Sequence, residues 1–240
     1  MARKSRRNQK RKKRLRLFFI LILVSYIFIL GHMEINKRNV ENTYHRLFHV
    51  DSVNKNEDDW SLVLVNKWNP ILTPSEMKLT EVGKGQFVDE RIYTYLQAMF
   101  DDARKKGIYP IVASGYRTQE IQQSIYDEKI SAFKAQGLSS KEARKEAELW
   151  VAIPGTSEHE LGIAVDINAD GIYSKGSEVY EWLANNAHRY GFIQRYPSNK
   201  TDITGVSHEP WHYRYVGEKV ATEIYNQNIC LEEYISYMNK

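Results

Sequence analysis

The chain has 240 residues, a formal net charge of +4 at pH 7 and a hydrophobic fraction of 42%. Its single cysteine, Cys230, excludes an intrachain disulfide and a cysteine-rich metal site. The composition therefore indicates one domain of ordinary size that is held together by its core.

The positive charge is concentrated at the N-terminus. The first 16 residues contain ten Lys or Arg and no acidic residue, and the remainder, with 24 basic and 30 acidic residues, has a net charge of −6. Such an arm could bind nucleic acid. Residues 17–30, LFFILILVSYIFIL, are almost entirely apolar, however, and a nucleic-acid-binding arm would leave this run unexplained. We therefore expect no nucleic acid among the partners.

The apolar run instead predicts a membrane helix. Counted from residue 15 to 33, it approaches the minimum of roughly 17 residues that a transmembrane helix needs. Flanking basic residues stay in the cytoplasm, so we expect a cytoplasmic arm over 1–16 and a single-pass signal anchor over 17–33. A cleaved signal peptide is the alternative, although the small-x-small cleavage pattern is missing. Residues 34–59 then predict an extracytoplasmic stem, and residues 60–240 the domain.

Helices and short strands alternate irregularly through the domain. The run SLVLV at 61–65 predicts a strand. In residues 89–107 apolar side chains recur at helical spacing, and Gly107 provides a C-terminal stop. Further helices are predicted over 118–137, from the capping box of Ser139 and Glu142 to Trp150, over 177–191, and in the tail from Gly217. Further strands are predicted at 109–114, 162–167, 192–196 and 211–216. This pattern favours an α+β fold over a doubly wound sheet.

The segment SEHELGIAVD, residues 157–166, places His159 and Asp166 close together in the sequence. An imidazole and a carboxylate suit Zn²⁺, which leaves one position open for water in hydrolases. Residues seven apart on a straight strand face opposite sides, so we expect Leu161 and Gly162 to form a turn that returns His159 to the strand of Asp166. Taken alone, such a pair is more often a structural hydrogen bond.

The segment HEPWHYRYV, residues 208–216, supplies a third candidate ligand. Pro210 favours an extended conformation at Glu209. Along the strand that follows, His212 shares one face with Arg214 and could complete the metal site. Glu209 lies nearby without being required as a ligand, and a free carboxylate beside a metal is what a general base requires. His208 is interpreted as a surface residue or as a residue that supports the ligands, rather than as a ligand.

The segment SGYRTQEIQQ, residues 114–123, brings Arg117 to the point where a strand turns into a helix. An arginine there could stabilise an oxyanion or bind a substrate carboxylate. The alternative is a surface arginine paired with an acid.

Together SGYRTQEIQ, SEHELGIAVDI and EPWHYRYVG resemble, in order and spacing, the VanY-type zinc D-alanyl-D-alanine carboxypeptidases. The resemblance spans roughly residues 62–217. It implies a small α+β zinc-peptidase domain with a central antiparallel sheet, acting on peptidoglycan stem peptides. It further implies the following roles: zinc ligands His159, Asp166 and His212, base Glu209, transition-state stabilisation by Arg117, and a substrate site lined by Ser157, Gln122 and Tyr126.

Three other functions remain open. An L,D-carboxypeptidase acting on tetrapeptide stems would use the same residues, because pocket contacts alone determine that choice. A peptidoglycan endopeptidase is the second alternative. A catalytically silent wall-binding module would have lost a ligand or the base, and here all four positions are filled.

Overall fold

The computed structural model describes residues 57–72 and 77–238. The predicted arm, anchor and nearly all of the predicted stem lie outside these residues, so they stay predictions. Within the described ranges no helix is long and apolar enough to cross a membrane.

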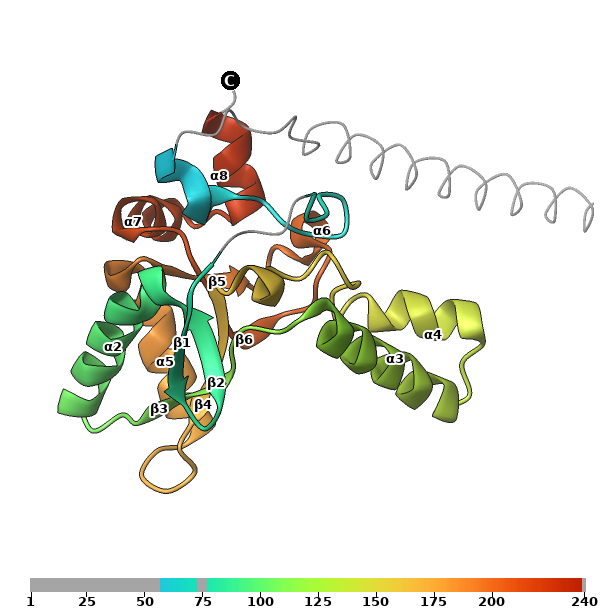
Figure 1. Ribbon diagram of the computed structural model, residues 1–240, viewed down its shortest axis with the longest axis horizontal. Helices are drawn as coiled ribbons and strands as arrows, with labels where there is room; N and C mark the ends of the chain where they lie inside the picture. The colour runs from blue at the N-terminus through green and yellow to red at the C-terminus, as the bar shows by residue number, and fades with distance from the viewer. Residues whose placement is uncertain (1–56, 73–76, 239–240) are drawn as a thin grey trace, which may run out of the picture. The chain divides into compact units, whose positions relative to one another are not determined.

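The elements follow one another as helices and short strands (Figure 1). In chain order they are η1 (Glu57–Leu62), β1 (Leu79–Gly83), β2 (Gln86–Asp89), α2 (Glu90–Lys105), β3 (Pro110–Ser114), α3 (Gln119–Ala135), α4 (Ser140–Ala147), η2 (Glu158–Leu161), β4 (Ala164–Ala169), α5 (Gly176–Asn186), η3 (Ala187–Tyr190), β5 (Phe192–Tyr196), α6 (Thr201–Thr204), β6 (Glu209–Tyr215), α7 (Glu218–Gln227) and α8 (Leu231–Met238).

A four-stranded sheet in the order β3-β4-β6-β5 forms the centre of the fold, and every neighbouring pair in it is antiparallel. The hairpin β1-β2 forms a separate two-stranded sheet. The predicted α+β class with a central antiparallel sheet is confirmed.

The main core lies between one face of this sheet and helices α2 and α5. It contains Ile92, Leu96 and Met99 of α2 together with Val165 and Ile167 of β4, all fully buried. A second cluster joins α7 and α8 to the sheet, and a third joins α3 to α4. In Figure 1, α2 and α5 lie on one side of the sheet, and the α3–α4 pair projects from the other side.

The helix predicted over 89–107 is confirmed, because α2 begins after the Asp89 cap and ends before Gly107, which adopts a φ of 77°. The capping box of Ser139 and Glu142 is also present. The helix after it is shorter than predicted. It ends at Ala147, where Leu149 and Trp150 donate backbone hydrogen bonds only three residues back.

The helix predicted over 177–191 is divided, because α5 ends at Asn186 and the 3₁₀ turn η3 follows it. Gly191 terminates this turn with a φ of 82°. The hairpin β1-β2 was not predicted, although Gly83, Lys84 and Gly85 between its strands all have positive φ, as tight hairpin turns require.

The strand predicted at 61–65 is wrong. Residues up to Leu62 belong to the 3₁₀ helix η1, and residues 63–65 form no strand. The physical reason is that a side chain, and not a neighbouring strand, donates hydrogen bonds to the backbone carbonyl groups of this run. Arg214 Nη2 donates to the carbonyl oxygens of Ser61 and Val63, each at 2.9 Å. Val65 of this run is buried in the main core although it pairs with no strand.

Candidate metal centre

Two of the predicted ligands are brought together by strand pairing. Asp166 on β4 and His212 on β6 are direct partners in the antiparallel register, which places their side chains on the same face of the sheet. His212 Nδ1 lies 3.0 Å from Asp166 Oδ1. The neighbours of Asp166 along β4, Val165 and Ile167, are buried in the main core, so their packing fixes the strand that carries the carboxylate.

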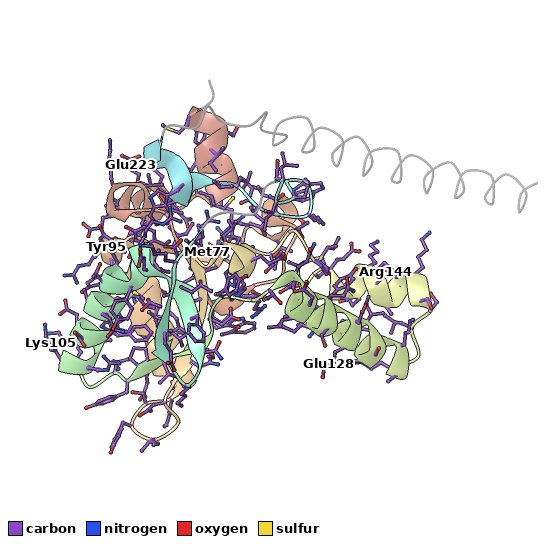
Figure 2. All side chains as sticks on the ribbon, viewed as in Figure 1. Met77, Tyr95, Lys105, Glu128, Arg144 and Glu223 are labelled. Carbon is purple, nitrogen blue, oxygen red and sulfur yellow. The ribbon has the colours of Figure 1, made fainter. Side chains whose placement is uncertain are left out.

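His159 reaches the same place through a turn, as predicted. It lies in η2, and Gly162 ends this turn with a φ of 69°, a conformation that glycine adopts without strain. A Cβ at Gly162 would approach the Sδ atom of Met77, labelled in Figure 2, to 3.0 Å. The turn leaves His159 Nε2 at 3.4 Å from Asp166 Oδ1.

The protonation of His159 is set by a backbone group. Its Nδ1 lies 2.7 Å from the carbonyl oxygen of Gly115, and a carbonyl can only accept, so Nδ1 carries the hydrogen and Nε2 is free as a ligand. Burial lowers the pKa of His159, partly opposed by Asp166, which favours the neutral ring. Only glycine fits at position 115, because a Cβ there would lie 2.2 Å from the carbonyl oxygen of Phe87. The absence of a side chain therefore lets the Gly115 carbonyl reach His159.

The three side chains fit a zinc ion. One ligand atom from each of His159, Asp166 and His212 lies within 4.8 Å of the others. Two imidazole nitrogens and one carboxylate are a donor set that zinc binds tetrahedrally, with a fourth position open in hydrolases. Burial raises the pKa of Asp166, but the two histidines outweigh it and hold that pKa well below its usual range.

The carboxylates around His212 favour its charged form in the metal-free protein. Burial lowers its pKa, but the nearby carboxylates of Asp166 and Glu158 raise it to about 9. A metal ligand must be deprotonated at the coordinating nitrogen, so metal binding releases a proton from His212.

Glu209 lies beside the ligands without joining them. Its Oε2 atom is 3.9 Å from His212 Nδ1, and its side chain is buried. Burial raises the pKa of Glu209 to about 7, partly opposed by His212. A carboxyl group with a pKa near the working pH can both accept and return a proton, as a general base must.

Arg117 also lies at the site. Its guanidinium donates to Asp166 Oδ2 at 2.7 Å, to Ser114 Oγ at 2.9 Å and to Gln122 Oε1 at 3.3 Å. The alternative of a surface arginine paired with an acid is not what the structure shows, because the side chain of Arg117 is only 16% exposed and the acid it pairs with is the candidate ligand Asp166. Its action on a transition state stays a prediction.

The three predicted substrate-binding residues, Gln122, Tyr126 and Ser157, are all buried. Gln122 is buried and uses both ends of its amide within the protein, towards Arg117 and the carbonyl oxygen of Ala152. The Tyr126 hydroxyl donates to Glu148 at 3.1 Å, which directs it towards the segment after α4. Ser157 is buried immediately before η2. Contact of these three with a substrate stays a prediction.

Sequence reasoning missed several supporting residues. Ser114 and Gly115 were part of the SGYR motif, so attention to the residues before Arg117 could have found them. Glu158 immediately precedes His159 but received no role. His208 is exposed and lies 3.4 Å from Gln194, in agreement with its interpretation as a surface residue.

The chain is similar to proteins of known family. A family model described as "VanY: D-alanyl-D-alanine carboxypeptidase" matches residues 85–218. A D-alanyl-D-alanine carboxypeptidase of Enterococcus faecalis is 61% identical over 180 residues, which are 75% of this chain and 67% of that protein.

Solved structures agree with the sequence match. The structure of VanYB in complex with D-alanine-D-alanine is 61% identical, with a TM-score of 0.72 over 73% of this chain and 97% of the other. A mutant of the vancomycin resistance D,D-pentapeptidase VanY, in complex with Zn(II), is also 61% identical, with a TM-score of 0.72 over 73% of this chain and 99% of the other. This chain therefore belongs to the VanY family of D-alanyl-D-alanine carboxypeptidases.

Proposed function

We propose that this chain is a zinc-dependent D,D-carboxypeptidase that removes the terminal D-alanine from peptidoglycan stem peptides. The observation that carries the proposal is the group of His159, Asp166 and His212, with the buried carboxyl group of Glu209 beside it. The relatives named above carry the substrate class, because they are D-alanyl-D-alanine carboxypeptidases or bind D-alanine-D-alanine.

The chemistry divides between the metal and the chain. When bound, zinc acts as a Lewis acid and lowers the pKa of water from about 16 towards 7. Glu209 accepts a proton from the attacking water and delivers it to the leaving amino group of D-alanine. Arg117, whose guanidinium is fixed by Ser114 and Gln122, stabilises the negative charge that develops on the carbonyl oxygen.

The test offers the purified chain a stem pentapeptide, the corresponding tetrapeptide, and the pentapeptide with its terminal carboxylate amidated. Mass spectrometry should detect the loss of one D-alanine from the free pentapeptide and little reaction with the amidated one. The reason is that donors which bind a buried carboxylate are left unpaired when it is neutralised. Preference for the tetrapeptide would favour the L,D-carboxypeptidase, and release of dipeptides would favour the endopeptidase.

We also propose that the chain is anchored in the cell membrane, with the N-terminus in the cytoplasm and the catalytic domain outside. The basic residues before residue 17 and the apolar run after them support this orientation, and a cell-wall substrate requires it. Protease added to intact spheroplasts should degrade the domain and spare the arm. A fully protected domain would contradict the orientation.

A further inference from the structure

Beneath the metal centre lies a cluster of four buried charged side chains. Two arginines and two glutamates, each at most 1% exposed, form it: Glu158, Arg195, Arg214 and Glu232. Arg195 donates from Nε to Glu158 Oε1 at 2.8 Å and from both Nη atoms to the carboxylate of Glu232, at 2.9 and 2.6 Å. Arg214 Nη1 lies 2.9 Å from Glu158 Oε1. Burying ions costs free energy, so such a cluster is weak evidence for stability alone.

The two oxygens of Glu158 have different surroundings. Oε1 faces both arginines, whereas Oε2 has no hydrogen-bond partner among the described residues. His212 Nε2 lies 3.5 Å from Oε2, and Nε2 also lacks a hydrogen-bond partner within the same residues. Two buried polar atoms without partners therefore face each other, and a hydrogen bond between them satisfies both.

We propose that Glu158 is a positioning residue for the metal centre, which accepts a hydrogen bond from His212 Nε2 and so presents Nδ1 of the same ring to the metal. A carboxylate can only accept, so Nε2 must carry a hydrogen, and the lone pair of the metal-binding ring lies on Nδ1. This nitrogen is the one that faces Asp166 Oδ1. In His159 the roles of the two ring nitrogens are reversed, because Nδ1 donates to the carbonyl oxygen of Gly115 and Nε2 is free to bind the metal.

The remainder of the cluster holds Glu158 in place. The arginines occupy Oε1, so only Oε2 is available to His212. Arg195 is in turn fixed by Glu232, at the start of α8, and Glu232 also accepts from Asn66 Nδ2 at 3.1 Å. The C-terminal helix and the loop around Asn66 thus support a metal ligand through a continuous series of buried contacts.

The test compares Glu158→Gln with Glu232→Gln in the full chain. Both variants remove one negative charge from the same buried cluster, and both leave Arg195 with one fewer anionic partner. Only Glu158 faces His212. In the Glu158→Gln protein the amide oxygen stays with the arginines, so the NH₂ group faces Nε2. An NH₂ group cannot accept, and the ring must then carry its hydrogen on Nδ1, where it blocks metal binding.

This inference rests on the zinc site of the proposed function, so zinc affinity is measured directly, by competition with a chromophoric chelator, and thermal unfolding of the metal-free proteins is measured beside it. We expect both variants to lose thermal stability, and Glu158→Gln to lose more, because Glu158 pairs with both Arg195 and Arg214. Zinc affinity should fall by about 10–100-fold in Glu158→Gln and by less than about threefold in Glu232→Gln.

Glu158→Asp provides a second variant in case the glutamine protein does not fold. It keeps the negative charge that the arginines require, but its shorter side chain cannot reach both them and His212, so zinc affinity should again fall. Equal losses of zinc affinity in the Glu158 and Glu232 variants, or wild-type affinity in either Glu158 variant, would overturn the role of Glu158. A wild-type chain that binds no zinc would overturn the proposed function as well, which separates the two failures.

Discussion

Replacing Glu209 by glutamine separates the general base from the metal ligands. Glutamine keeps the size of the side chain but cannot accept the proton, so D-alanine release should fall by about 10²–10⁴-fold, the usual contribution of a general base. Zinc content should stay near that of the wild type, because Glu209 lies outside the ligand group. Near-normal turnover with zinc bound would show that Glu209 is not the base.

The same substitution has an effect on stability that follows from burial. The pKa of Glu209 rises from 4.5 to about 7 in the folded, metal-free protein, so folding favours the protonated form. The stability that this shift contributes is fully present below the unfolded pKa and is lost as the pH rises through about 7. A shift of this size corresponds to ~3 kcal/mol at about 1.4 kcal/mol for each pH unit. Glutamine resembles the protonated form and keeps that stability.

Urea unfolding with a chelator present measures this effect across a pH series. Metal-free Glu209→Gln should be more stable than the wild type by up to ~3 kcal/mol near pH 8, and the difference should vanish near pH 4. A difference that is independent of pH, or that grows as the pH falls, would refute the argument from burial.

The remaining predictions concern the ligands and their supports. His212→Ala should strip zinc, and metal analysis that finds full occupancy in this variant would refute the ligand assignment. Arg117→Lys should keep zinc but lose about 10²–10³-fold in turnover, because an ammonium group cannot reproduce the planar guanidinium that holds three acceptors. Gly115→Ala should lower the free energy of unfolding by about 1–3 kcal/mol and weaken zinc binding, since the new methyl group would strike the Phe87 carbonyl oxygen and displace the carbonyl that orients His159. Urea unfolding and chelator competition measure the two effects separately, and a Gly115→Ala protein as stable as the wild type would contradict the close approach.

Parts of the candidate metal site could be predicted because they depend on local rules, whereas the pairing of β4 with β6 that joins Asp166 to His212 does not. The turn at Gly162 is a property of a short segment, and the alternation along β6 places His212 and Arg214 on one face whatever the partner strand is. The helix α2 followed from its apolar spacing in the same way. Local sequence patterns were sufficient wherever the structure itself is local.

The contacts that surround the ligands could not be predicted, because they join segments far apart in the chain. The strand expected at 61–65 is absent because the Arg214 side chain binds the carbonyl groups there, although the two segments are about 150 residues apart in sequence, for example 153 between Ser61 and Arg214. Arg195 and Glu232 belong to no sequence motif that would have indicated their role. Glu158 is adjacent to His159 in the sequence, but its orientation towards His212 depends on Arg195 of β5 and Arg214 of β6.

The alternation of the central strands explains how the fold positions two of the three candidate ligands, Asp166 and His212. Val165 and Ile167 are fully buried in the main core, and Asp166 between them must point to the opposite face. Tyr213, also fully buried, fixes His212 and Arg214 in the same manner on β6. The core contacts on one face of the sheet therefore set the positions of the ligands on the other. Ligands on paired strands are held more firmly than ligands on loops, and here the position of each follows from the packing of its neighbours in sequence.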